Sequence, residues 1–120
     1  MRVDNFQQVL EDLNSSSSDI EASALISNDG LAIASALPAG IDDDRVGAMS
    51  AALLSLGDRA GRELARGSID RIMIQGEKGY VITTSAGDEA VLTIMAKSNA
   101  KLGLIFLDIK RAAAALAKLI

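Results

Sequence analysis

The sequence predicts an α/β fold with one five-stranded antiparallel sheet and helices on both of its faces, in the order α-β-β-α-β-β-β-α. Two observations predict this class. Apolar residues recur at steps of three and four in three segments, and five short runs of apolar and β-branched residues are bounded by turn residues. The last three runs follow one another through short turns, which is typical of an antiparallel meander. With 120 residues, the chain is expected to form a single domain over positions 1–120.

Each predicted element has boundary signals of its own. Asp4 can cap the first helix, Asn28-Asp29-Gly30 is a hairpin turn, and Pro38 closes the second strand. The run Asp42-Asp43-Asp44 opens the longest helix, because Asp is a good cap and negative charge offsets the positive end of the helix dipole. The predicted elements are, in order, a helix over Val3–Leu13, strands over Ile20–Ser27 and Leu31–Leu37, a helix from Asp42 to about Gly67, strands over Ile69–Gln75, Tyr80–Ser85 and Ala90–Ala96, and a helix over Leu104–Ile120.

The composition excludes several classes of function. The chain has no His, Cys or Trp, so disulfides, iron–sulfur clusters, thiol nucleophiles and ordinary zinc sites are excluded. Histidine is also the usual acid and base near neutral pH, so the sequence predicts a protein that is not an enzyme and needs no metal or cofactor. The net charge of −4 and the three aromatic residues argue against nucleic-acid binding.

The chain also lacks the signals of a membrane or secreted protein. Its longest uncharged stretches, Gly30–Ile41 and Val46–Gly57, have twelve residues each, whereas a spanning helix needs about 20. The opening residues Met1–Asn5 contain no apolar core of a signal peptide. These features predict a cytoplasmic protein. Because 49% of the residues are hydrophobic, we also expect a partner subunit to cover some apolar surface.

The long central helix has three different faces at 100° per residue. One stripe is apolar and is expected to pack on the sheet: Val46, Met49, Leu53, Leu56, Ala60 and Leu64. A second stripe consists mostly of small residues: Gly47, Ala51, Leu54, Asp58, Gly61 and Ala65, with Ser50 and Gly57 at its edge. Glycine inside a helix costs about 0.5–1 kcal/mol relative to alanine, so a close approach of another backbone should offset that cost. We expect the same helix of a second copy there, although a neighbouring helix of the same chain is an alternative.

The third face of this helix carries arginines. Arg59, Arg62 and Arg66 are interpreted as a docking surface for an acidic or mixed partner, because arginine is a frequent hot-spot residue. The alternative is a solvated face whose cations offset the helix dipole. Arg71 on the third strand and Asp58 on the small stripe form a further candidate pair across an interface. The chain contains no phosphate-binding glycine motif, and Asp42-Asp43-Asp44 is interpreted as a helix cap rather than a metal site.

The element order and several segments resemble the roadblock family of dynein light chains. The similar segments are Ala24–Ser35 in the first hairpin, Asp42–Leu56 in the long helix, Gly76–Tyr80 and Asn99–Ile105. This resemblance, which extends in architecture to profilin-like domains, implies a homodimer or heterodimer in which the central helices pack together and the third strands pair. The third-strand residues Arg71, Ile72, Met73 and Ile74 would then belong to the dimer interface.

The same resemblance implies a function. Roadblock proteins regulate or scaffold small Ras-like GTPases, some bacterial members stimulate GTP hydrolysis by their partner, and the family has no shared catalytic residue. The sequence is therefore interpreted as a non-catalytic dimeric regulator that binds a small Ras-like GTPase. The alternative is a small-molecule or signal-sensing domain of profilin-like or PAS-like architecture, which would need a pocket between the sheet and a helix.

Overall fold

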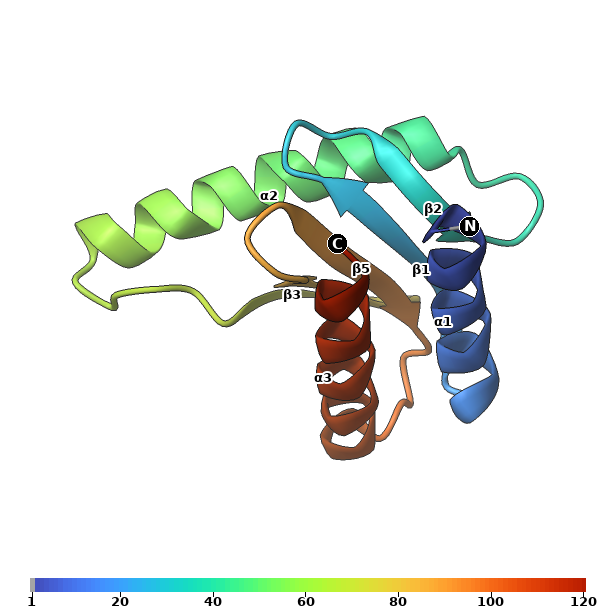
Figure 1. Cartoon of the computed structure of the whole chain (residues 1–120). Helices are drawn as coiled ribbons and strands as arrows, with labels where there is room; N and C mark the ends of the chain where they lie inside the picture. Colours follow the sequence, from blue (N-terminus) through green and yellow to red (C-terminus); the bar gives the residue numbers. More distant parts are fainter. Residues whose placement is uncertain (1) are drawn as a thin grey trace.

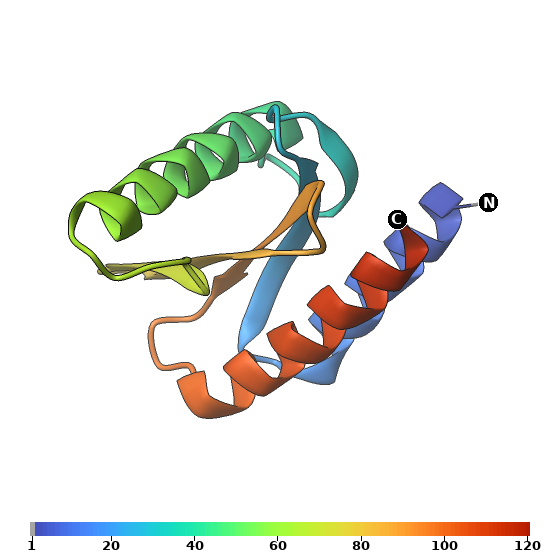
Figure 2. The ribbon, with the colours of Figure 1, turned by 60° about the vertical axis from the view of Figure 1, so that its left-hand side comes forward.

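A computed structural model describes residues 2–120, and its elements follow the predicted order (Figure 1). The helices are α1 (Arg2–Ser16), α2 (Asp43–Glu63) and α3 (Leu102–Leu119), and the strands are β1 (Ile20–Ser27), β2 (Ala32–Ala36), β3 (Arg71–Gly76), β4 (Gly79–Ser85) and β5 (Ala90–Ala96). Helix α2 lies on one face of the sheet, and α1 and α3 lie on the other (Figure 2). The predicted fold class is therefore confirmed. Met1, at the start of the N-terminal segment considered above, lies outside the described residues.

The five strands form one sheet in the order β2-β1-β5-β4-β3, and every neighbouring pair is antiparallel. Strands β2 and β3 are its two edges. Opposed residues in an antiparallel pair place their side chains on the same face. Met73 lies opposite Ile82, on the face covered by α1 and α3, and Ile74 lies opposite Val81, on the face of α2. The register therefore determines which side chains of β3 face α2 and which face the layer of α1 and α3.

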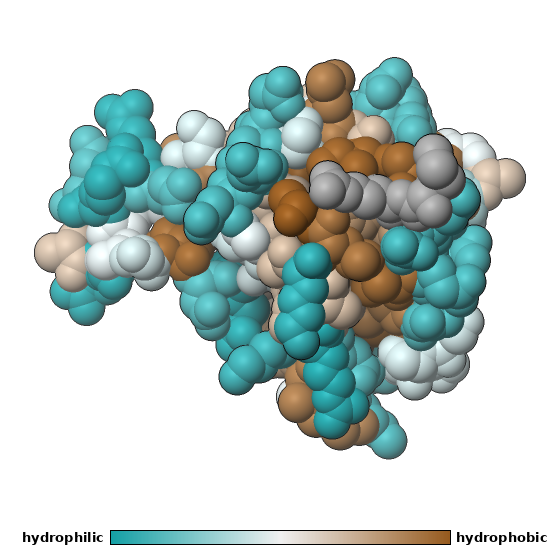
Figure 3. Space-filling view, viewed as in Figure 1, coloured by the Kyte–Doolittle hydropathy of each residue, from teal (hydrophilic) through white to brown (hydrophobic). Residues whose placement is uncertain are grey.

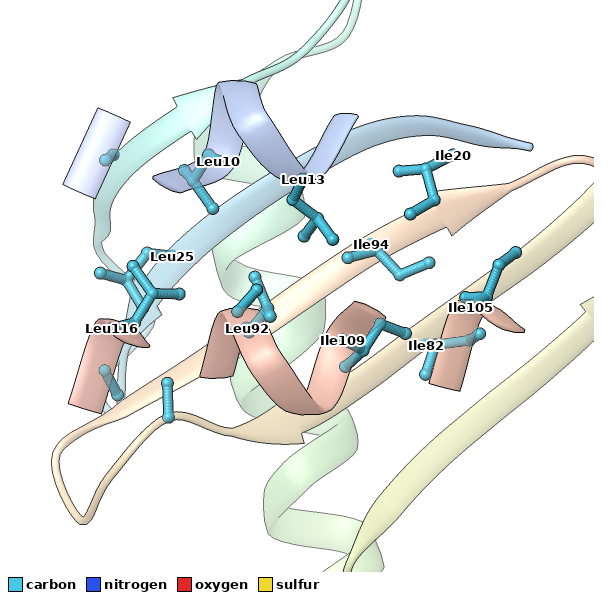
Figure 4. Close-up of a cluster of buried hydrophobic side chains, with 14 of the residues drawn as sticks. Leu10, Leu13, Ile20, Leu25, Ile82, Leu92, Ile94, Ile105, Ile109 and Leu116 are labelled. Atoms are coloured by element: carbon cyan, nitrogen blue, oxygen red, sulfur yellow. The ribbon is translucent and has the colours of Figure 1, made fainter. Parts of the chain in front are cut away.

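The larger hydrophobic core lies between the sheet and the α1–α3 layer (Figure 4). Both helices present apolar residues at helical spacing to the sheet, as the sequence predicts. Fully burying one Leu or Ile side chain contributes about 1.5–3 kcal/mol, so this layer holds much of the stability. The large side chains of this core that are fully buried are Leu10, Leu25, Ile82, Leu92, Ile94, Ile105 and Leu116.

Helix α2 covers a smaller core made of Ala24, Ile26, Val46 and Val91. Below it, the Ser50 hydroxyl donates to the carbonyl of Val46 (2.7 Å) and lies 2.7 Å from Thr93 Oγ1, which is 3.1 Å from Thr83 Oγ1. These buried hydroxyls attach α2 to β5 and β4.

Within residues 2–120, no helix combines the length and the apolar character that crossing a bilayer would require.

Two helix boundaries differ from the prediction for identifiable reasons. Helix α2 ends at Glu63 because Ala65 adopts a left-handed backbone with φ of 57°, and the N–H groups of Arg66 and Gly67 both donate to the carbonyl of Gly61. Helix α3 begins at Leu102, two residues earlier than predicted. The residue before it is held by a distant carboxylate, since the N–H of Lys101 donates to Asp19 Oδ2 at 3.1 Å.

Candidate interaction surface on helix α2 and strand β3

The face of α2 that packs on the sheet lies between the two stripes defined from the sequence. Val46, Gly47, Ser50 and Gly61 are its buried residues. By contrast, Met49, Leu56 and Leu64 are 57%, 65% and 68% exposed. The prediction that the whole apolar stripe covers the sheet is therefore wrong for these three residues. A sequence pattern defines which residues share a stripe, but not how the helix is rotated about its axis.

The glycines of the small stripe make close approaches inside the chain itself. A Cβ atom on Gly47 would collide with the carbonyl oxygen of Gly30, and one on Gly57 would collide with the side chain of Ile72. A Cβ atom on Gly61 would lie 2.6 Å from the carbonyl oxygen of Gly67. The predicted close backbone contact therefore exists, but it is intramolecular.

This result corrects two of the residues assigned from the sequence to a dimer contact. Gly47 and Gly61 are buried within the monomer, so neither offers a free face to a second copy. Ala51 and Leu54 are half-buried, and their place in a dimer contact stays a prediction. Asp58 and Ala65 are exposed, and Ala65 lies beyond the end of α2. The apolar face that remains most accessible carries larger side chains. We call it the α2 seam: the exposed Met49 and Leu56 and, between them, the half-buried Leu53 and Ala60.

Strand β3 lies beside this seam and is an unpaired edge of the sheet. Ile74 is 44% exposed on the face of α2, whereas Met73 is 41% exposed on the opposite face. Ile72 is half-buried beneath Gly57 of α2. The C-terminal end of α2 projects past β3 and the rest of the sheet (Figure 1). The uncovered seam and the unpaired edge therefore adjoin each other.

Arg71 points away from the seam. Its guanidinium lies over the ring of Phe106 in α3, 3.9 Å from the ring centroid, and 3.6 Å from a carboxylate oxygen of Asp70. Asp58 lies on α2, across the sheet from that position. Arg71 and Asp58 therefore do not pair within the chain, and an ion pair between them across an interface stays a prediction.

The three arginines of the third face are all exposed. Arg59 forms an ion pair of 3.0 Å with Glu63 one turn later on the helix. Arg62 is in the last turn of α2, and Arg66 lies beyond its end, where its Nε donates to the carbonyl of Leu64. Hydrophilic side chains gather over this projecting end of the helix (Figure 3). The surface is accessible and is positively charged at three points.

A cavity of about 450 Å³ opens between the N-terminal half of α2 and the sheet. Its walls are mostly apolar, and its rim includes Asp42 and Arg45. Asp42 Oδ1 accepts the N–H of Asp44 at 3.0 Å, which confirms the predicted helix cap. The side chains that line the cavity from the helix and the strands are Val46, Met49, Ser50, Leu53, Val81, Thr93 and Met95.

The fold and this surface define a small α/β domain with one partly uncovered helix face beside an open sheet edge. More specifically, the chain belongs to the Roadblock/LC7 domain family, whose model matches residues 6–96. This is a family of GTPase-associated regulators whose domains are generally non-catalytic. The uncharacterized protein MJ0310 of Methanocaldococcus jannaschii is 38% identical over 106 residues, which cover 88% of this chain and 91% of that protein.

Solved structures share the same fold. One is described as MglB with a tetrameric arrangement; it is 24% identical, has a TM-score of 0.89, and the match covers 98% of this chain and 89% of that one. The gliding protein MglB of Thermus thermophilus is 22% identical with a TM-score of 0.86, covering 98% and 90%. A Roadblock/LC7 domain from Streptomyces avermitilis is 18% identical with a TM-score of 0.88, covering 93% and 94%.

Proposed function

We propose that the chain is a non-catalytic regulatory platform that associates with a second copy of itself and binds a small Ras-like GTPase. The observation that carries this proposal is the α2 seam, which is uncovered and lies directly beside the unpaired edge β3. Large apolar side chains on a helix and an open strand edge both favour association with another surface. The tetrameric arrangement described for one structural neighbour supports self-association in this fold.

Self-association through this region uses residues from two elements. The α2 seam supplies the apolar contact, and the backbone of β3 supplies strand pairing that would extend the sheet into a second copy. Ile72 and Ile74 face α2, whereas Arg71 and Met73 face α3. Pairing at the edge therefore leaves the α1–α3 layers of both copies on one side and both α2 helices on the other.

The partner-binding surface in this proposal is the exposed arginine face of α2. Arg59, Arg62 and Arg66 are exposed and none of them belongs to the seam, so in this proposal they remain accessible when the seam is covered. Their role is docking, because long flexible arginines at an exposed face bind carboxylates on a partner. Since Ras-like GTPases and their nucleotides are cytoplasmic, the proposal also places the chain in the cytoplasm.

The test uses the wild-type protein and one double variant as baits in lysate of the source organism. We expect the wild type to retain a protein of small-GTPase size that carries bound guanine nucleotide, and Arg59→Glu with Arg62→Glu to retain at least tenfold less. The double variant should keep the wild-type sedimentation coefficient. Equal retention by both baits would remove the docking role, and no guanine nucleotide in the retained fraction would contradict the GTPase assignment. The hydrolysis rate of the retained GTPase, with and without the chain, then distinguishes stimulation from scaffolding.

A small-molecule sensing domain is the second candidate function, and the cavity beside α2 favours it. Its volume of about 450 Å³ and its apolar walls fall within the usual range of ligand pockets. Native mass spectrometry of the purified protein checks this candidate, because a bound metabolite would add a defined mass. In the platform function, the same cavity is covered by the second copy.

A further inference from the structure

Helix α3 lies on the opposite face of the sheet from α2 (Figure 2), and a second pocket opens between this helix, the start of β3 and the end of β4. Its volume is about 470 Å³, and it shares no lining residue with the cavity beside α2. Arg71 lies opposite Thr84 in the β3–β4 pair, so both side chains face the α3 layer. We call this site the α3 pocket, and the residues that decide its chemistry are Arg71, Thr84 and Ser85 of the sheet and Phe106, Leu107 and Lys110 of the helix.

The Arg71 guanidinium is held in one position at this pocket. Its Cζ atom lies over the Phe106 ring, 3.9 Å from the centroid, and such stacking fixes the plane of the guanidinium while its N–H groups point sideways. Among residues 2–120, the carboxylate that pairs with it is that of Asp70, 3.6 Å away, which is beyond hydrogen-bond distance. The Asp70 side chain is 92% exposed, and an ion pair in such contact with water is weak. Arg71 is therefore preorganised and available to bind an anion.

Lys110 supplies a second cation at the pocket. It follows Phe106 by one turn of α3, so the two side chains lie on the same side of the helix. In the part of the chain that the structure describes, no carboxylate forms an ion pair with Lys110. Helix α3 carries three cations and one carboxylate, whereas the whole chain has a net charge of −4. The pocket is therefore a locally positive site on an acidic protein, which favours anionic ligands.

Hydroxyl groups and an apolar wall complete the pocket. Ser85 is exposed at the end of β4, where its hydroxyl can donate to a ligand oxygen. The Thr84 hydroxyl donates to the carbonyl of Asp70 at 2.8 Å, which ties the segment before β3 to β4. On the helix side, the Leu107 side chain is 46% exposed. A ligand that fills the pocket therefore needs an anionic group at one end and an apolar body at the other.

We propose that the α3 pocket binds a small organic anion, whose carboxylate or phosphate group accepts hydrogen bonds from Arg71 and Lys110 and whose apolar body packs against Leu107. The planar guanidinium matches two oxygens of such a group, and the ammonium adds a point charge. The volume of the pocket is within the usual range for small ligands. This binding goes beyond the proposed function and does not require it, because the α3 layer lies across the sheet from the α2 seam.

Titration with four probes at constant ionic strength tests the proposal: phenyl phosphate, benzoate, inorganic phosphate and benzyl alcohol. Binding is followed by NMR through the backbone amides of Arg71, Thr84 and Ser85 and the Nε–H of Arg71. We expect at least one of the two aromatic anions to give saturable shifts at these groups. It should bind about tenfold or more tightly than inorganic phosphate or benzyl alcohol, because it alone uses both the cations and the apolar wall. The preference between phenyl phosphate and benzoate then identifies the anionic group.

Variants that remove one charge locate the site. Arg71→Gln and Lys110→Gln should each weaken binding by about tenfold, because each removes a charge-assisted hydrogen bond. Arg71→Lys, which keeps the charge but loses the planar group, should weaken it less than Arg71→Gln. Arg111→Gln is the matched control, since it removes the same charge from the exposed surface of α3 outside the pocket. Its dissociation constant should stay within about twofold of the wild-type value, because screening weakens the effect of a more distant charge.

Three other outcomes would overturn the proposal. The first is the absence of a saturable shift with either aromatic anion at millimolar concentration. The second is an equal loss of affinity in Lys110→Gln and Arg111→Gln, which would mean that anions are attracted to the basic helix in general. The third is equal affinity for inorganic phosphate and the aromatic anions, which would mean that the apolar wall contributes nothing. Because the Lys110 side chain is exposed, unchanged thermal unfolding of Lys110→Gln separates these outcomes from a loss of the fold.

Discussion

The side-chain amide of Gln7 in α1 donates a hydrogen bond to the backbone carbonyl of Ser35 in β2, at 2.7 Å. Asn14, two turns later on α1, donates to the carbonyl of Ala36 at 2.9 Å. These carbonyls belong to an edge strand, and a helix bonded to such a strand hinders its pairing with another chain. Helix α1 therefore protects the β2 edge. No side chain of the described residues donates to a backbone carbonyl of β3 at the opposite edge, and this asymmetry supports β3 as the edge that pairs.

Replacing Gln7 with methionine tests this protection. Gln7→Met keeps the length of the side chain but removes the donor, so we expect a loss of about 1 kcal/mol in the free energy of unfolding. Gln8→Met is the matched control, because the Gln8 amide bonds only the exposed carboxylate of Asp12. Its loss should stay below about 0.5 kcal/mol. Urea denaturation measures both values, and equal losses would mean that the contact with β2 contributes nothing specific.

Replacing Ala65 with glycine is expected to stabilise the protein. Its φ of 57° is left-handed, a conformation that costs a residue with a Cβ about 1–2 kcal/mol. Ala65→Gly should therefore raise the free energy of unfolding by about 0.5–1 kcal/mol. Ala48→Gly, on the exposed surface of the regular helix, should lower it by a similar amount. Thermal unfolding of the two variants gives the comparison, and a destabilised Ala65→Gly would contradict the strain at this position.

The order and the type of the elements could be predicted from the sequence because they depend on local periodicity and turn residues. Asn28-Asp29-Gly30 and the pattern of α1, for example, both define their elements within a few residues. The rotation of α2 could not be predicted in this way, since it depends on how Gly47 fits against Gly30, a residue that is distant in sequence.

The two faces of α2 should respond differently to substitution. Gly61→Leu should destabilise the monomer by several kcal/mol, because even the Cβ atom would lie 2.6 Å from the carbonyl oxygen of Gly67. Leu56→Ser should change the free energy of unfolding of the monomer by less than about 1 kcal/mol, since Leu56 is exposed, but it should weaken self-association. Urea denaturation in dilute solution and sedimentation equilibrium measure the two effects separately. A Gly61→Leu protein with wild-type stability would mean that this side of α2 is free after all.

The contact between Asp19 and the start of α3 gives the last prediction. The Asp19 carboxylate accepts the N–H of Lys101, the residue before α3, and α3 has no side-chain cap. Asp19→Ala should therefore cost about 1 kcal/mol, within the usual range for losing one hydrogen bond, whereas Asp19→Asn, which keeps an acceptor, should cost less. Hydrogen exchange locates the effect: the amides of Leu104 and Ile105, which bond the carbonyl of Lys101, should exchange faster in Asp19→Ala than in the wild type.

Asp12→Ala provides the control for that measurement, because the Asp12 carboxylate accepts a hydrogen bond only from Gln8 on the exposed surface of α1. If both variants lose the same stability and the first turn of α3 exchanges at the wild-type rate in each, the carboxylate of Asp19 does not stabilise that helix. If only Asp19→Ala shows faster exchange at Leu104 and Ile105, the chain segment before β1 holds the start of α3 in place. This hydrogen bond then adds to the buried contacts of Ile105, Ile109 and Leu116 that hold α3 against the sheet.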